Sequence, residues 1–337
     1  MKISTVLKWV GFATAILSLI AGIRELNKVF ADRIEAGRKV ASLLASERLQ
    51  LRARDYASAW RSLDQASQVN ADSAEIHTAQ EAVAMEWLEN ATAKEGESLS
   101  DIAVKLEPVL TRGVAASLQP VHQADLLAHI GWSYFLRSRE GASGFDPSGN
   151  YADAVNRDPS NPYAQAMWGH WILWNKRDPA EAAPHFSAAL ASHRERAFVR
   201  HLQLAALLNG RNSACDQELV RVLNAIRLEQ GTVDADTKRA VFNVYDTEIM
   251  PSDDETRSFV DAVSTLDHLA TFQWLFDDRS PDESEALPRL CYLSVLQEAA
   301  GQRTEALAGY KELRSKLNGR TGALLKVADA GIKRLSS

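Results

Sequence analysis

The sequence of 337 residues contains only two cysteines, Cys215 and Cys291, and this scarcity excludes two classes of protein. Two cysteines cannot supply the dense cross-links of a small secreted scaffold, and a chain of this length can bury a core without them. They also cannot make an all-cysteine zinc site, and no histidine pair at ligand spacing stands near either of them. We therefore expect two free thiols and no structural zinc.

Acidic residues outnumber basic ones outside the N-terminal segment. Residues 1–39 contain seven Lys or Arg and three acidic residues, whereas residues 40–337 contain 31 basic and 41 acidic residues. The net charge of -6 is therefore divided into +4 for the first segment and -10 for the rest. Non-specific affinity for nucleic acid comes from clustered Lys and Arg, so we expect no nucleic-acid partner.

Catalytic and ligand-binding motifs are also missing. The sequence has no His-Glu-x-x-His, no Gly-rich phosphate loop and no Gly-x-Ser-x-Gly elbow, and His185, His193 and His201 are eight residues apart, which is not the i, i+4 spacing of a helical metal pair. Cys215 stands near a predicted helix N-terminus, where the dipole can lower a thiol pKa, but no base partner is evident and we interpret it as a packing residue. We expect no enzyme, no cofactor, no metal and no small-molecule ligand.

One acidic loop requires a separate interpretation. It lacks the spacing of an EF-hand, so we expect a solvated turn rather than a cation site. Its acidic residues are Asp277, Asp278, Asp282, Glu283 and Glu285.

A single long apolar run lies near the N-terminus. Trp9 to Ile23 are 15 consecutive uncharged residues between Lys8 and Arg24. If Lys8 extends its amine toward the headgroups, the apolar segment becomes Ile3–Ile23, 21 residues, close to the ~20 that a spanning helix needs. Trp9 then lies near the membrane interface, where indole rings are favoured. The sequence predicts a single-pass membrane anchor, a helix of about 3–23.

Two alternatives to the anchor are a buried core helix and a cleaved signal peptide with its cleavage site at Val29–Ala31. A cleavable signal keeps the segment before its site short and mostly neutral, whereas three of the five residues 24–28 are charged, which favours the anchor. Lys and Arg are more frequent after the run than before it, which favours a cytoplasmic body over a periplasmic one.

The rest of the chain shows helical periodicity throughout. Apolar residues recur at i, i+3, i+4 and i+7, and alternating runs rich in Val, Ile and Thr are absent. Short breaks separate the segments at Arg54-Asp55, at 158–162 and at 176–179. Asp178, Pro179 and Glu181 form the pattern of a capping box, and so do residues 252–255. We expect an all-α fold.

Several segments match the 34-residue pattern of the tetratricopeptide repeat, a pair of helices with small residues where the two helices meet. The matching residues are Tyr56, Ala59, Leu63, Ala66 and Ala71; Leu127, Ile130, Gly131, Tyr134, Tyr151, Ala154 and Pro159; Trp168, Gly169, Ala182, Phe186 and Ala189; and Leu290, Leu293, Gly301, Ala306 and Tyr310. The chain resembles bacterial membrane proteins with an N-terminal anchor and tetratricopeptide repeats. The pairs at 74–112 and between 195 and 280 match poorly.

The resemblance implies a right-handed α-solenoid in which Gly131 and Gly169 allow two helices of a pair to approach closely. We expect two parts: residues 1–39, an anchor with a basic juxtamembrane linker, and residues 40–337, the repeat domain. Residues 320–335 are predicted to form a capping helix. The loop from Ser138 to Asn150 is about four residues longer than the repeat expects.

The repeat register places an aromatic set on the concave surface of such an array, where partner proteins are bound. The predicted groove residues are Asp125, Trp132, Phe135, Tyr163, His170 and Trp174. An alternative is that the long loop 138–150 covers these aromatic residues. The groove positions Ala128, Trp132, Ala166 and His170 lack the Lys and Asn that clamp chaperone carboxylates, so we expect apolar and stacking contacts.

Together these features predict a membrane-tethered adaptor, located in the bacterial inner (plasma) membrane, that binds a partner protein or peptide in its groove. One alternative is a structural or regulatory subunit that acts as a spacer in a larger membrane complex. The other is an enzyme with a site hidden in 195–285.

Overall fold

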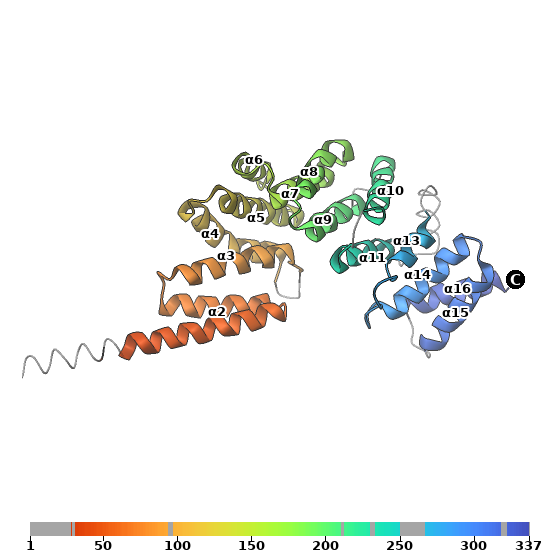
Figure 1. The fold of residues 1–337 in the computed structure, drawn as a ribbon, viewed down its shortest axis with the longest axis horizontal. Coiled ribbons are helices and arrows are strands. Elements are labelled where there is room, and N and C mark those ends of the chain that lie inside the picture. The colour runs from red at the N-terminus through yellow and green to blue at the C-terminus, as the bar shows by residue number, and fades with distance from the viewer. Residues whose placement is uncertain are drawn as a thin grey trace, which may run out of the picture. The chain divides into compact units, whose positions relative to one another are not determined.

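The computed structural model describes residues 28, 31–93, 97–209, 212–229, 233–249, 267–317 and 322–336. Every regular element of two or more residues in these ranges is a helix, which confirms the all-α expectation (Figure 1). The predicted anchor, 3–23, lies outside the described residues. Among the helices that the described ranges contain, none combines the length and the apolar character needed to cross a membrane.

The chain divides into two compact units, which we describe separately. Unit 1 comprises residues 1–117 with 139–142, and unit 2 comprises 118–138 with 143–337. The division lies inside the segment 40–337 that was expected to be one repeat domain. The first helix spans 31–52 and therefore begins within the segment expected to be a linker.

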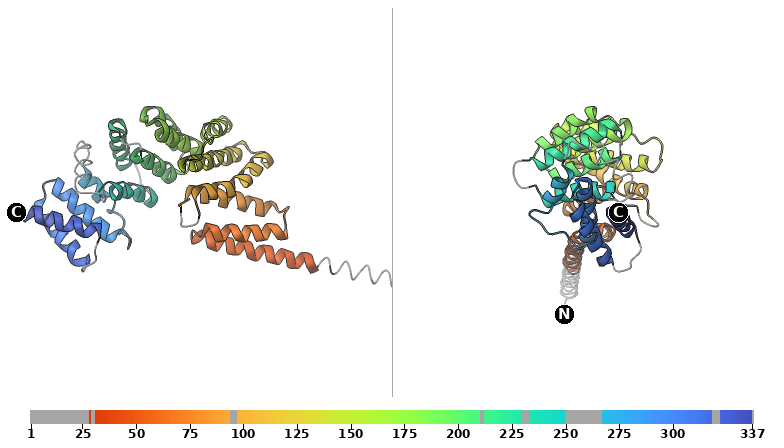
Figure 2. Two further views of the ribbon diagram at one scale, coloured as in Figure 1. Left: turned by 180° about the vertical axis from the view of Figure 1, so that it is seen from behind. Right: turned by 90° about the vertical axis from the view of Figure 1, so that its right-hand side faces the viewer.

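Unit 1 contains the first helix followed by α2 (Tyr56–Val69), α3 (Ala74–Glu89) and α4 (Leu99–Ala116). The first helix, α2 and α3 lie side by side in both views (Figures 1 and 2). The chain turns at Arg54, whose φ of 55° is left-handed, and the Asp55 side chain caps α2 by accepting from the Ser58 N–H. The small and branched side chains between these helices, such as Ala59 and Leu63, are fully buried.

Unit 2 contains the remaining helices. They are α5 (Pro120–Arg139), α6 (Ser148–Arg157), α7 (Pro162–Lys176), α8 (Pro179–Ala191), α9 (Arg196–Asn209), α10 (Ser213–Arg227), α11 (Ala235–Ile249), α13 (His268–Trp274), α14 (Ala286–Ala299), α15 (Arg303–Leu317) and α16 (Ala323–Leu335). Helix α7 packs on α8, and α14 packs on α15. Helix α9 packs on both α7 and α11, so alternate helices also contact one another. An array of helix pairs has this pattern.

The closest approach between helices of a pair occurs at glycine. A Cβ added to Gly131 on α5 would lie 2.5 Å from the ring of Tyr151 on α6, and one added to Gly169 on α7 would lie 2.9 Å from the ring of Phe186 on α8. Both rings are 2% exposed or less. The packing role that the sequence suggested for Gly131 and Gly169 is therefore confirmed.

The helix ends follow the local signals in the sequence. Asp178 caps α8 by accepting from the N–H groups of Ala180 and Glu181, and Pro179 is the first helical residue, as expected. A capping box would also have the Glu181 carboxylate accept from the Asp178 N–H. In the structure this carboxylate instead accepts from Lys176. The predicted capping helix 320–335 corresponds to α16 and ends at the same residue. The second predicted box, 252–255, lies outside the described residues.

We predict that Gly131→Ala destabilises unit 2 by about 1–3 kcal/mol, because the new methyl group overlaps a ring that has no room to move. The free energy of unfolding in urea measures this loss. Gly149→Ala on α6 is the matched control, because a Cβ there meets nothing within 4 Å. Equal unfolding midpoints for the two variants would contradict the packing role of Gly131.

Candidate protein-binding surface

Four of the six predicted groove residues form one aromatic cluster. Trp132 and Phe135 come from α5, and His170 and Trp174 come from α7. The ring centroids of Trp132 and Phe135 are 4.6 Å apart, and those of Trp132 and His170 are 5.1 Å apart. Phe135 lies 4.9 Å from His170 and 5.5 Å from Trp174, edge-on in both cases. The structure therefore brings these four predicted residues together, whereas their role in binding a partner stays a prediction.

The helical spacing explains why these four side chains meet. Residues three or four apart lie on one face of a helix, as Trp132 and Phe135 do on α5 and His170 and Trp174 do on α7. One turn earlier on each helix stands an alanine, Ala128 or Ala166, and both alanines are fully buried.

The four residues differ sharply in exposure. Trp132 is 6% exposed, Phe135 2% and His170 5%, whereas Trp174 is 37% exposed. The sequence predicts the shared face but treats all four as equally accessible. In the structure the buried rings of Phe135 and His170 lie against Trp174, which is the accessible aromatic side chain of this cluster.

The other two predicted residues, Asp125 and Tyr163, belong to neighbouring contacts. The Asp125 carboxylate accepts from Asn161 Nδ2 at 2.7 Å and lies 3.9 Å from Arg194. The Tyr163 ring lies 4.8 Å from His129 and 5.2 Å from Phe198 on α9. These contacts tie α5, α7 and α9 together.

The long loop before α6 packs on a different face of α5. Its Phe145 ring lies edge-on to Tyr134 at 5.4 Å, and the Arg137 guanidinium lies 3.6 Å from the Phe145 centroid. Tyr134 is two residues from Trp132, on the order of 200° around the helix. These contacts do not favour the alternative in which the loop covers the groove.

An ion cluster on α9 was missed by the sequence reasoning. Arg200 is 7% exposed, donates to Gln203 at 2.9 Å and also pairs with Glu229, and Arg196 donates to the same carboxylate at 2.8 Å. Burial raises the pKa of the Glu229 carboxyl, but the hydrogen bonds from Arg200 and Arg196 outweigh burial and hold the net pKa below its usual value. The two arginines at i, i+4 were the available signal, but their partner lies 29 residues away.

The cysteine and histidine side chains that the sequence offered as reactive or metal-binding groups make packing and hydrogen-bond contacts instead. Cys215 is buried, and burial raises the pKa of its thiol, which supports the packing interpretation. His185 Nδ1 lies 2.7 Å from Gln165 Oε1, and burial lowers the pKa of that imidazole. In the described part of the chain, no three His, Cys, Asp or Glu side chains gather closely enough to hold a metal ion.

The acidic loop is more ordered than the solvated turn that was expected. Asp278 pairs with Lys238, which is 3% exposed, and Asp282 pairs with Arg239 at 2.8 Å. Glu285 forms two hydrogen bonds with Arg279. Three of the five carboxylates thus form ion pairs with basic side chains. Two of these basic side chains, Lys238 and Arg239, lie on α11.

Comparisons with known proteins do not assign a family. No family model matches the chain, and no curated protein matches it. Among solved structures, one that is similar is the crystal structure of a tetratricopeptide repeat protein from Parabacteroides merdae, at 12% identity and a TM-score of 0.40 over 89% of this chain and 100% of that one.

We predict that Glu229→Gln lowers the free energy of unfolding by about 1–3 kcal/mol at pH 7, because Arg200 remains buried without its charged partner. Since the folded pKa of Glu229 lies below the unfolded one, this contribution is complete above the unfolded pKa of roughly 4.3 and is lost as the pH falls through the folded pKa. Urea titrations of both proteins at pH 7, 5 and 3.5 measure the difference, which we expect to shrink on acidification.

The matched control for this prediction is Glu181→Gln. Glu181 pairs with Lys176, and both side chains are more than two-fifths exposed, so we expect a change within about 0.5 kcal/mol at every pH. A Glu229 effect that is independent of pH would contradict the ion-pair explanation.

Proposed function

We propose that this chain is a membrane-tethered adaptor of the tetratricopeptide-repeat type, which binds a partner protein through the surface around Trp174. The observation that carries this proposal is a tryptophan that is 37% exposed and lies against the buried rings of Phe135 and His170. Tryptophan is enriched among the residues that contribute most to protein interfaces. The partner contact is expected to be apolar and stacking, as the aromatic composition of the cluster indicates.

We include a membrane anchor in this proposal because residues 9–23 are a continuous apolar run. A helix of about 3–23 in the bacterial inner membrane confines the partner near the bilayer and raises its effective concentration there. The excess of Lys and Arg after the run favours a cytoplasmic position for the two units.

The second candidate function is a spacer in a larger membrane complex. The burial of Trp132, Phe135 and His170 favours it, because these rings stabilise the α5 and α7 contact whether or not a partner binds. The enzyme alternative in 195–285 has less support, since charged side chains in the described parts of that range form ion pairs with one another, such as Arg200 with Glu229 and Lys238 with Asp278.

We predict that Trp174→Ala weakens partner capture from detergent-solubilised membranes by at least about tenfold while leaving the fold intact, because the ring is partly exposed. Leu228→Ala is the matched control, since Leu228 is a large apolar residue of the same unit that is 74% exposed. If Trp174→Ala and Leu228→Ala capture the same partners equally, the spacer is favoured. Trp132→Ala is a test of stability instead, with an expected cost of about 3–5 kcal/mol.

We predict that the full chain stays in the membrane fraction after carbonate extraction and retains Met1 or Lys2 at its N-terminus. A mature protein that starts at Asp32 would show that a signal peptide had been removed. Protease treatment of sealed inverted vesicles, whose cytoplasmic face is outward, is expected to digest both units; complete protection would place them in the periplasm.

A further inference from the structure

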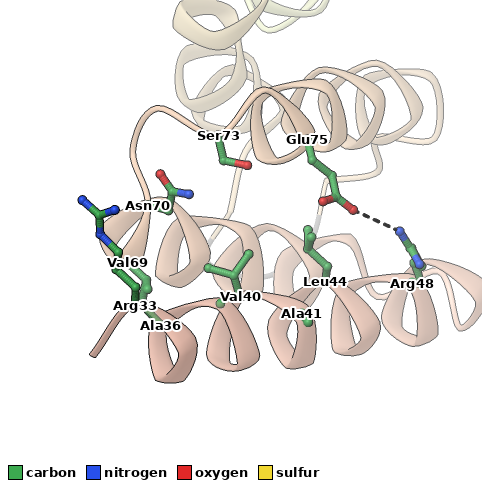
Figure 3. A pocket seen from close by; sticks show the side chains of 11 residues that line it. Arg33, Ala36, Val40, Ala41, Leu44, Arg48, Val69, Asn70, Ser73 and Glu75 are labelled. Atoms are coloured by element: carbon green, nitrogen blue, oxygen red, sulfur yellow. Dashed lines mark ion pairs between the residues drawn. The ribbon is translucent and has the colours of Figure 1, made fainter. Parts of the chain in front are cut away.

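A groove on unit 1 has no role in the function proposed above. It has a volume of about 650 Å³ and runs between the first helix and the turn that joins α2 to α3 (Figure 3). Its lining residues are Arg33, Ala36, Gly37, Val40, Ala41, Leu44, Arg48, Val69, Asn70, Ser73 and Glu75.

The floor of the groove is apolar and open. Leu44 is 4% exposed and Val40 is half-buried, and a Cβ added to Gly37 would meet nothing within 4 Å. The apolar lining positions on the first helix recur every three or four residues from Ala36 to Leu44, between Arg33 and Arg48. This spacing makes a continuous apolar stripe of about 12 Å, the length of roughly two helical turns.

The rim of the groove is basic. Of the two arginines that line it, Arg33 is exposed and has no acidic partner among the described residues. Arg48 lies 3.6 Å from Glu75, but both side chains are about two-thirds exposed (67% and 66%), so this pair adds little. Residues 31–54 contain six basic and three acidic side chains, and one of the acids, Glu47, is buried.

The positive charge of the rim favours one of three possible ligands of the groove: a second copy of the chain, an anionic lipid or a helix of a partner protein. A symmetric contact with a second copy would place one basic helix against another, which is unfavourable. An anionic lipid headgroup suits the arginines but leaves the apolar stripe unoccupied. A helix with apolar residues on one face and acidic residues beside them satisfies both the stripe and the rim.

We infer that the groove between the first helix and the α2–α3 turn binds an acidic amphipathic helix of a partner protein. Apolar side chains of that helix, at i, i+3, i+4 and i+7, lie over Gly37, Val40 and Leu44. Its Asp and Glu residues lie beside Arg33 and Arg48. This surface is independent of Trp174, so the chain holds two protein-binding sites, one on each unit.

The test uses the full chain in nanodiscs of zwitterionic lipid and a phage library of random 18-residue peptides. The library is first depleted on the Gly37→Trp variant, in which the indole fills the groove, so that peptides binding elsewhere are removed. The remaining peptides are then selected on the wild-type protein. Helices disfavour glycine by about 1 kcal/mol, so this substitution is not expected to weaken the first helix. The selected peptides are expected to be rich in Asp and Glu, with apolar residues at helical spacing.

A synthetic copy of a selected peptide is expected to lose at least tenfold in affinity on Gly37→Trp and on Arg33→Glu. Ala45→Trp and Lys39→Glu are matched controls on the same helix outside the groove, with expected changes below twofold. The inference is overturned if no peptide depends on Gly37, if the dependent peptides are basic, or if both charge reversals act equally. It is also overturned if nanodiscs containing phosphatidylglycerol, or a second copy of the chain, displace the peptide.

Discussion

The contact of a glycine with an aromatic ring is the constraint on which unit 2 depends. Gly131 and Gly169 let the rings of Tyr151 and Phe186 lie where a methyl group would otherwise stand. Each contact limits how closely the two helices of one pair approach, α5 with α6 and α7 with α8. The aromatic cluster of Trp132, Phe135, His170 and Trp174 then joins these two pairs through α5 and α7.

The sequence predicts those features whose causes are local. The break at Arg54, the cap at Asp178 and the small residues at Gly131 and Gly169 each act within one helix pair, so their residue types are sufficient. The ion cluster of Arg200 with Glu229 could not be predicted, because its partners lie 29 residues apart and meet only after α9 and α10 have packed. The same reason applies to Lys238 and Asp278, 40 residues apart, which make the acidic loop an ordered one.

The candidate site shows the limit of register arguments. Helical spacing places Trp132 and Trp174 on the shared face, but exposure depends on every side chain that packs above them. Burial of 94% for Trp132 and of 63% for Trp174 comes from their different depths in the α5 and α7 interface. A repeat register therefore predicts which residues share a face. Only the packed structure distinguishes a buried ring, such as that of Trp132, from a partly exposed one, such as that of Trp174.

The two proposed surfaces differ in what a partner would have to supply. Trp174 is stacked on His170 and packed edge-on against Phe135, so it loses little side-chain entropy when a partner covers it. The groove on the first helix instead combines an open apolar stripe with Arg33, which has no acidic partner in the described part of the chain, so the proposed binding there depends on charge as well as on shape. The basic excess of the N-terminal segment continues through the first helix and into the turn at Arg54, past the boundary at residue 39 that the charge count suggested. It therefore belongs to a folded helix as well as to the segment before it.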